Sequence, residues 1–430
     1  MSGILPPVLT LDCILLPMKR VVITGMGAIT PIGNDIRTFW DNLIAGRSGA
    51  GRITRFDPSA FRTQIACEVK DFDPSLWLDK TEIKRTDPFT QYALAAAAQA
   101  IQDCGIDFSA MNPYDTGVIW GSGQGGMLTF EEQVTEYATG NGIPRFSPFF
   151  VSKLITNMAS GMISIKHGLK GINYATVSAC STSNTALMDA FNYIRWGKAK
   201  VMVTGGSEAP ITAPSIGGFC AIKAMTTQNH SPQTACRPFD SARDGFLMGE
   251  GAGALILEEY EHAKARKANI YAEVAGAAMT ADAYHMTAPH PEGEGAYAAM
   301  RLALQDAGLD PGDVDYLNAH ATSTPVGDIS ELKAITKFFN GKADRLHISA
   351  TKSVTGHLLG AAGAIEGIAS VLAIKNGIIP PTINLTDPDP AVPPQLNIVR
   401  LEALEKKVDV AMSNAFGFGG HNGIVVFKKI

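Results

Sequence analysis

The sequence has no Cys-x-x-Cys motif and no long apolar run, and these absences exclude several classes of protein. None of its six cysteines belongs to a Cys-x-x-Cys pair, so neither a zinc site nor a redox dithiol is indicated. No apolar run approaches the roughly 20 residues that cross a bilayer. The N-terminus lacks the basic region and the cleavage site of a signal peptide. We therefore expect a cytoplasmic protein that holds no metal and does not enter a membrane.

The sequence also lacks an excess of positive charge and a low-complexity linker. Its 36 basic and 41 acidic residues give a net charge of −5, which argues against nucleic-acid binding. Hydrophobic residues make up 46% and charged residues 18%, so we expect a large core and no extensive disorder. The only candidate domain boundary is a change in composition near residue 260. The sequence from residue 18 onward resembles the beginning of a folded chain, so we expect residues 1–17 to form an extension outside the main fold.

Strand and helix patterns alternate along the chain. The predicted strands cover residues 21–24, 116–120, 174–177, 200–204, 253–257, 270–277, 314–318, 347–350, 408–413 and 423–427. The predicted helices cover residues 35–45, 91–103, 151–167, 181–196, 261–267, 296–307, 329–339 and 361–375. Strands that alternate with helices form parallel sheets covered on both faces, so the fold class is α/β.

Cys180 is the candidate nucleophile. It stands in TVSACSTSN, between a β-branched strand and a helix rich in small residues. A thiol at a helix N-terminus lies near unpaired N–H groups and the positive end of the helix dipole. We expect this position to lower the pKa of the thiol, to make a thiolate available near neutral pH and to hold an oxyanion. A buried structural cysteine is the competing interpretation, and this stretch alone does not separate the two.

Two histidines among small residues favour the nucleophile. His320 stands in NAHATSTP at the carboxyl end of a predicted strand, where α/β proteins build their sites. His357 stands in KSVTGHLLGAAGAIE, just before a glycine-rich helix. A neutral imidazole can donate an N–H to a thioester carbonyl or exchange a proton with a thiol. The other seven histidines are interpreted as structural residues.

Together these motifs resemble the signatures of the elongating β-ketoacyl-acyl carrier protein synthases, and most closely the synthase II type. The resemblance also includes Lys352 and the run SNAFGFGGHN with Phe418, and it extends from about residue 18 to residue 430. It implies a thiolase-like fold in which two similar α/β halves, residues 18–260 and 261–430, form five αβαβα layers. It further implies a homodimer without metal or other cofactor, whose substrates are carried on the phosphopantetheine of acyl carrier protein.

The resemblance implies a ping-pong condensation. Cys180 would take an acyl group from acyl carrier protein, and malonyl-carrier would then lose CO2 and attack the acyl-enzyme, which would complete one step of fatty acid elongation. His320 and His357 would stabilise the enolate, and the backbone N–H groups of Cys180 and Phe418 would form the oxyanion hole.

Supporting roles are implied by the same resemblance. Lys352 and Glu366 would form a buried ion pair, and Thr322 and Thr324 would contact the phosphopantetheine arm. Phe418 would also act as a gate, and Gln124 would line the acyl pocket. The acidic carrier needs a basic docking face, for which the candidates are Lys80, Lys84, Arg85, Arg145 and Lys223.

The motifs also bear on several alternative families. Thiolase needs a second catalytic cysteine where SNAFGFGGHN has none, the initiating synthase III type would carry asparagine at His357, and a chain-length factor would lack Cys180. The pattern Gly121-x-Gly123-x-x-Gly126 matches a dinucleotide fingerprint, but no ribose-binding acid follows, so we interpret it as a turn. A ketosynthase of a type II polyketide or aryl-polyene pathway has nearly identical motifs and stays open.

Overall fold

The structure, a computed structural model, describes residues 18–430, so the predicted N-terminal extension lies outside the described residues. Its centre is one hydrogen-bonded sheet of 11 strands. The first half of the chain contributes β1 (Val21–Ile29), β4 (Thr116–Gly121), β5 (Asn173–Thr176), β6 (Val201–Glu208) and β7 (Gly251–Glu259). The second half contributes β8 (Ala272–Ala281), β9 (Tyr316–Asn318), β10 (His347–Ser349), β14 (Val410–Gly417) and β15 (His421–Lys428), with β12 (Asn397–Ile398) at its edge.

The two halves repeat one topology. From the outer edge inward, the first half has the order β5-β4-β6-β7-β1 and the second half the order β10-β9-β14-β15-β8. Numbered along the chain within each half, both orders are 3-2-4-5-1. In each half the outer pairings are parallel and the inner ones antiparallel. The halves join where β1 pairs with β8, from Val21 opposite Val274 to Ile23 opposite Ala272.

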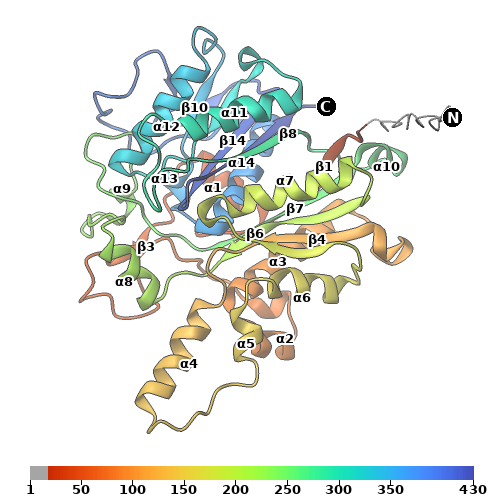
Figure 1. The fold of residues 1–430 in the computed structure, drawn as a ribbon, viewed down its shortest axis with the longest axis vertical. Helices are drawn as coiled ribbons and strands as arrows, with labels where there is room; N and C mark the ends of the chain where they lie inside the picture. The colour runs from red at the N-terminus through yellow and green to blue at the C-terminus, as the bar shows by residue number, and fades with distance from the viewer. Residues whose placement is uncertain (1–17) are drawn as a thin grey trace, which may run out of the picture.

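Helices complete the predicted five layers (Figure 1). The outer face of the first half is covered by α3 (Pro88–Cys104) and α6 (Met158–His167), and that of the second half by α11 (Glu294–Ala307) and α12 (Pro325–Phe338). Between the halves lie α7 (Thr182–Arg195) and α14 (Ala362–Asn376), which contact each other and strands of both halves. Every residue of α14 from Ala362 to Ile374 is buried, as expected of a helix that is apolar on nearly all sides, with Glu366 the one charged residue in this stretch. The thiolase-like fold class is confirmed.

Most predicted elements are present with shifted ends, but the single helix expected at residues 151–167 is wrong. The chain instead forms α5 (Phe150–Leu154) and α6, separated by Ile155 in an extended conformation. The break occurs because the carbonyl of Leu154 accepts the N–H of Gly126 at 2.9 Å. The predicted division at residue 260 falls between β7 and β8, at the first turn of α10 (Tyr260–Ala265), and stays a prediction.

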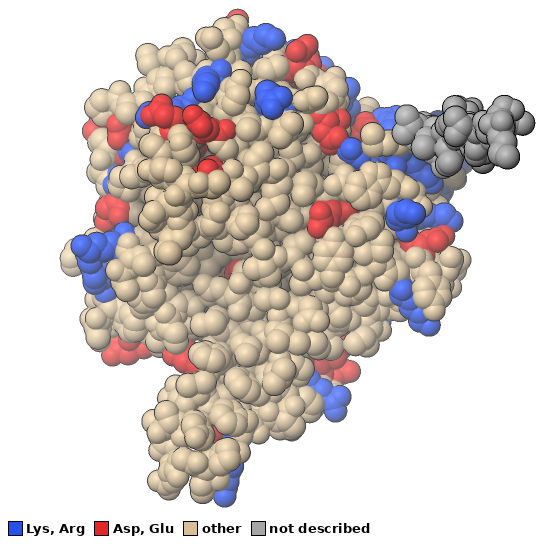
Figure 2. Space-filling model, viewed as in Figure 1, with Lys and Arg blue, Asp and Glu red and all other residues tan. Residues whose placement is uncertain are grey.

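The two longest helices that the sequence analysis did not predict are α4 (Met127–Thr139) and α8 (Ala213–Ala221). With α5, α4 projects from the body of the molecule (Figure 1), and Figure 2 shows few charged side chains on this projection. The remaining elements are α1 (Ile36–Ile44), β2 (Gly51–Arg52), β3 (Ile65–Ala66), α2 (Lys80–Arg85), α9 (Pro232–Ala235), α13 (Lys352–Thr355), β11 (Ile378–Ile379) and β13 (Leu404–Glu405). Within residues 18–430 we find no helix both long and apolar enough to span a membrane.

Candidate active site

Cys180 lies on a tight turn between β5 and α7. The turn is a 3-10 segment, Ala179–Ser181, and Ala179 has a φ of 50°, a left-handed value that is strained for a residue with a side chain. Two bonds to Thr182 fix the turn: its Oγ1 donates to the carbonyl of Ala179 at 2.6 Å and accepts the N–H of Ser178 at 2.9 Å. The turn therefore holds the thiol at the N-terminus of α7, as the sequence predicted.

The environment of the Cys180 thiol differs from the expectation. Burial raises the pKa of the thiol to about 12, although the charge of Lys352 and a hydrogen bond from the backbone N–H of Phe418 both lower it. The expectation of a lowered pKa is wrong for the free protein, because removal from water outweighs the charge of Lys352 and the hydrogen bond from Phe418. The resting thiol is therefore protonated at neutral pH and has to lose its proton as it reacts.

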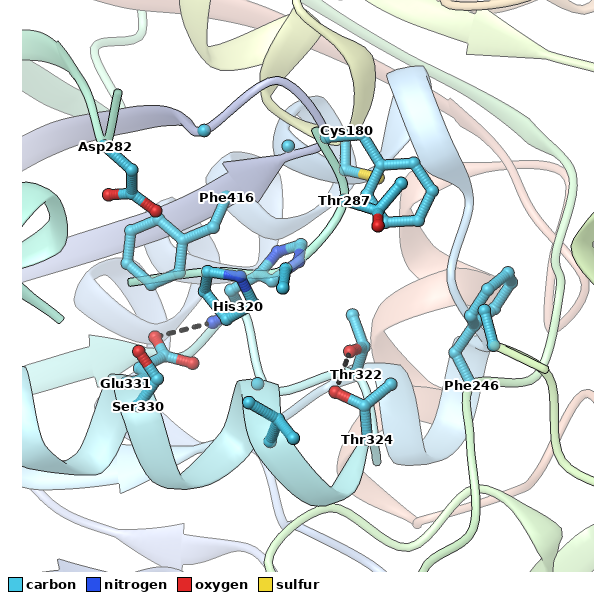
Figure 3. A pocket seen from close by; sticks show the side chains of 18 of the residues that line it. Cys180, Phe246, Asp282, Thr287, His320, Thr322, Thr324, Ser330, Glu331 and Phe416 are labelled. Carbon is cyan, nitrogen blue, oxygen red and sulfur yellow. Dashed lines mark hydrogen bonds between the residues drawn. The ribbon is translucent and has the colours of Figure 1, made fainter. Parts of the chain in front are cut away.

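His320 faces the same cavity as Cys180 (Figure 3), and His357 lines it too, although both follow Cys180 by more than a hundred residues. Their ring centroids are 5.4 Å apart and the rings are nearly perpendicular, at 87°. Burial, and then the charge of Lys352, lowers the pKa of each imidazole well below its usual value of 6.5. Both rings are therefore neutral at pH 7. Nδ1 of each ring is buried and has no hydrogen-bond partner among residues 18–430.

Lys352 and Glu366 form an ion pair behind the histidines and do not line the cavity. Their side chains are 1% and 3% exposed, and Nζ of Lys352 donates to Oε1 of Glu366. Burial raises the pKa of Glu366 to about 7, while Lys352 acts in the opposite direction. Lys352 comes from α13 and Glu366 from α14, so the pair also ties the loop that carries His357 to the central helix.

Glu331 is a site residue that the sequence analysis missed. It is 2% exposed, and its carboxylate accepts the N–H groups of His320 at 2.9 Å and Ala321 at 2.7 Å. Nδ2 of Asn414, on β14, donates to it at 2.9 Å. These bonds fix the loop that carries His320. The available signal was a glutamate among apolar residues of the predicted helix, which a solvent-exposed position would explain equally well.

Three other predicted residues line the cavity, which has a volume of about 280 Å³. The hydroxyl oxygens of Thr322 and Thr324 are 3.2 Å apart on one wall (Figure 3). Phe418 lies in the turn between β14 and β15, with its ring centroid 6.2 Å from that of Phe219. A Cβ at the neighbouring Gly417 would come within 2.5 Å of the Ser178 carbonyl and 3.0 Å of the Cys180 nitrogen, so this position requires glycine.

Gln124 does not line the cavity, and its assignment to an acyl pocket stays a prediction. Its N–H donates to Oε1 of Glu208 at 3.0 Å, and its side-chain carbonyl accepts the Ser215 hydroxyl at 2.8 Å. Glu208 is fully buried and also accepts the N–H groups of Gly123 at 2.8 Å and Gly360 at 2.9 Å. Because the amides of the Gly121–Gly126 turn bind this carboxylate, they cannot hold a pyrophosphate, which supports interpreting it as a turn. In the described part of the chain, no group of three or more His, Cys, Asp or Glu side chains could hold a metal ion.

Comparison with known proteins gives consistent matches over nearly the whole chain. The family described as "Beta-ketoacyl synthase, N-terminal domain" matches residues 18–263, and "Beta-ketoacyl synthase, C-terminal domain" matches residues 271–386. The chain is 52% identical over 411 residues to 3-oxoacyl-[acyl-carrier-protein] synthase 2 of Staphylococcus aureus (strain COL), which covers 96% of this chain and 98% of that protein.

Solved structures show the same similarity. A β-ketoacyl synthase from Burkholderia phymatum STM815 is 36% identical with a TM-score of 0.89, over 96% of this chain and 100% of that chain. The ishigamide ketosynthase/chain length factor is 34% identical with a TM-score of 0.89, over the same shares of the two chains.

Proposed function

The chain belongs to the β-ketoacyl synthase family, and we propose that it is a 3-oxoacyl-[acyl-carrier-protein] synthase II, an acyltransferase that condenses acyl groups in fatty acid elongation. One observation carries the mechanism: Cys180 and two neutral imidazoles from the other half of the chain face a single cavity. The 52% identity to a synthase 2 exceeds the 34% identity to the ishigamide ketosynthase, which favours fatty acid elongation over a polyketide pathway.

In the first step, Sγ of Cys180 attacks the carbonyl carbon of acyl-carrier thioester. The thiol proton passes to a neutral imidazole in the cavity, since the free thiol does not ionise near pH 7. The charge that develops on the carbonyl oxygen is stabilised by the backbone N–H groups of Cys180 and Phe418. The carrier then leaves as a thiol after it has taken up the proton, and the acyl group remains on Cys180.

In the second step, malonyl-carrier occupies the same cavity and its C–C bond to the carboxylate breaks to release CO2. The electron pair is delocalised onto the thioester oxygen, which accepts N–H groups of His320 and His357. Because both imidazoles are neutral, they stabilise the enolate as hydrogen-bond donors. The enolate carbon then attacks the acyl carbonyl, the C–S bond to Cys180 breaks, 3-ketoacyl-carrier leaves, and the Cys180 thiolate takes up a proton from solvent to restore the thiol. Thr322 and Thr324 hold the phosphopantetheine arm in both steps.

We place the carrier at the mouth of the cavity near Lys223. Lys223 and Arg62 border a second hollow of about 200 Å³, and Ile222 beside Lys223 lines the main cavity. Two exposed cations at this second hollow suit an acidic carrier. The α2 candidates Lys80, Lys84 and Arg85, together with Arg145, remain further docking candidates. Of these, Arg85 stacks 5.1 Å above the ring of Phe149.

We also propose that two copies of the chain associate. β5 lies at one edge of the central sheet, and an exposed strand edge can pair with another chain. The projection of α4 and α5 carries exposed apolar side chains, including Phe130, Tyr137 and Phe146. The face of this projection seen in Figure 2 has few charged side chains. A second copy would cover this apolar surface. We further propose that the enzyme is cytoplasmic and uses no metal or redox cofactor.

The function is tested by replacing the nucleophile. Cys180→Ala should abolish condensation of a series of acyl-carriers with malonyl-carrier, with products identified by mass, and should leave CO2 release from malonyl-carrier measurable. Cys220→Ala removes a thiol that borders only the second hollow, and it should leave both activities intact. Full condensing activity in Cys180→Ala would refute the assignment.

A further inference from the structure

Arg243 is a buried arginine that the proposed mechanism does not use. It belongs to the stretch RPFDSARDGF at residues 237–246, and its side chain is 3% exposed. Its guanidinium lies beneath the turn that links His320 to α12. Nη2 donates to the carbonyl of Pro325 at 2.8 Å, and Nε donates to the carbonyl of Thr324 at 3.2 Å. One side chain therefore holds two successive carbonyls of the turn that carries the cavity threonines.

Residues close to Arg243 form hydrogen bonds with the rest of this turn. The N–H of Thr324 donates to Asp328 at 3.2 Å, and Asp328 lies 3.5 Å from Nε of Arg243. The carbonyl of Ser323 accepts the N–H of Gly245 at 3.1 Å, and its hydroxyl accepts the N–H of Arg237 at 3.0 Å. Ser323 has a φ of 69°, a left-handed value that a free turn would not keep.

The other contacts of Arg243 anchor it to the body of the protein. Nη1 donates to the carbonyl of Asp240 and to the carboxylate of Asp389, both at 2.8 Å. The planar guanidinium directs donors toward all these acceptors at once, whereas a lysine ammonium carries three donors on one nitrogen. The position therefore requires arginine.

We propose that Arg243 is a positioning residue, which holds the Thr322–Thr324 turn so that both hydroxyls face the cavity and bind the amides of the substrate's pantetheine arm. The inference rests on the proposed function, because that function supplies the arm. Arg243 does not reach the reacting atoms, since it is absent from the cavity wall while Thr322 and Thr324 are on it. Its effect should therefore depend on whether the substrate has amides.

The test compares two malonyl thioesters, malonyl-pantetheine and the amide-free S-ethyl malonyl thioester, by their CO2 release. Arg243→Met should reduce kcat/KM for malonyl-pantetheine about tenfold, mainly through KM, as expected from the loss of about one hydrogen bond. It should change kcat/KM for the ethyl thioester less than about twofold. Alkylation of Cys180 by iodoacetamide should keep its native rate.

Matched variants separate positioning from general damage. Arg195→Met removes a partly buried arginine that binds Asp306 with two bonds of 2.8 Å on another face, and it should change neither thioester. The double variant Thr322→Val/Thr324→Val should reproduce the selective loss, and adding Arg243→Met to it should reduce the selectivity no further. If Arg243→Met does not fold, Asp389→Asn, which removes one anchor, should give a smaller loss with the same selectivity.

Equal losses for both thioesters, no loss in a folded variant, or additive losses in the triple variant would overturn the inference. A native protein that releases no CO2 from either malonyl-carrier or malonyl-pantetheine would refute the proposed function itself. That result would appear before any variant is compared, so the two failures are distinguishable.

Discussion

The ion pair between Lys352 and Glu366 gives a prediction in which each single substitution has its own dependence on pH. Both side chains are almost wholly removed from water, so each charge depends on the other. Glu366→Gln keeps the volume and leaves the Lys352 ammonium without a counter-charge. We expect the free energy of unfolding to fall by about 3–5 kcal/mol, the usual loss when one partner of a buried pair is removed.

The two single variants should respond differently to pH. In Lys352→Met the folded state keeps Glu366 protonated, because its pKa is raised to about 7 even in the native protein, whereas the unfolded state releases that proton above about 4.5. The folded state then binds more protons, so stability falls as pH rises from 5 to 7, by up to about 1.4 kcal/mol per unit. In Glu366→Gln this carboxyl is absent, so the fall in stability between pH 5 and 7 should be absent too.

The double variant separates stability from activity. Lys352→Met/Glu366→Leu replaces the pair with apolar side chains of similar size, and its stability should lie within about 1 kcal/mol of native or above it. CO2 release should still fall, because the charge of Lys352 lowers the pKa of both His320 and His357.

The assay is chemical denaturation at one protein concentration and several pH values, combined with CO2 release from malonyl-carrier. Asp41→Asn is the control, since it breaks an exposed pair with Arg37 and should change stability by less than about 0.5 kcal/mol. Single variants that lose no more than this control, or that share one pH slope, would show that the pair is not the isolated charge couple described above.

Three further predictions concern the cavity. His320→Ala and His357→Ala should each slow CO2 release from malonyl-carrier about 100-fold or more, and unchanged release would remove that histidine from the site. Because the pKa of Cys180 is raised to about 12, alkylation of the free enzyme by iodoacetamide should accelerate about tenfold per pH unit from 7 to 10, and a plateau near neutral pH would contradict the burial argument. Gly417→Ala should reduce condensation at least about tenfold, because its Cβ would displace the Cys180 turn. Gly161→Ala, where a Cβ meets no atom within 4 Å, should retain full activity.

The sequence was sufficient where a feature depends on neighbouring residues. The strand, turn and helix around Cys180 could be predicted because β-branched residues, small residues and a helical pattern follow one another directly. The motif resemblance also identified the cavity threonines and Phe418. The positions of His320 and His357 at the ends of elements were predictable for the same local reason.

Features created by distant residues could not be predicted. The rise in the Cys180 pKa comes from burial by residues that are distant in the sequence. Glu331 binds Asn414, which lies 83 residues away, so its role depends on the folded structure. The break between α5 and α6 depends on Gly126, which lies before a whole intervening helix. The duplication is a property of strand order, and the two halves do not share the motifs that would reveal it.

Because the topology repeats, the turns that precede α7 and α14 occupy equivalent positions in the two halves but carry different residues. The 3-10 turn at Leu359–Ala361 precedes α14 as Ala179–Ser181 precedes α7, and Leu359 has a φ of 47° close to that of Ala179. Gly360 thus occupies the place that matches Cys180, and a Cβ there would lie 2.6 Å from the Glu208 carboxylate. The first repeat therefore contributes the thiol and the second contributes the imidazoles, because Gly360 leaves no room for a second cysteine. If the chain were cut between β7 and β8, neither fragment could catalyse a turnover until the two fragments had associated.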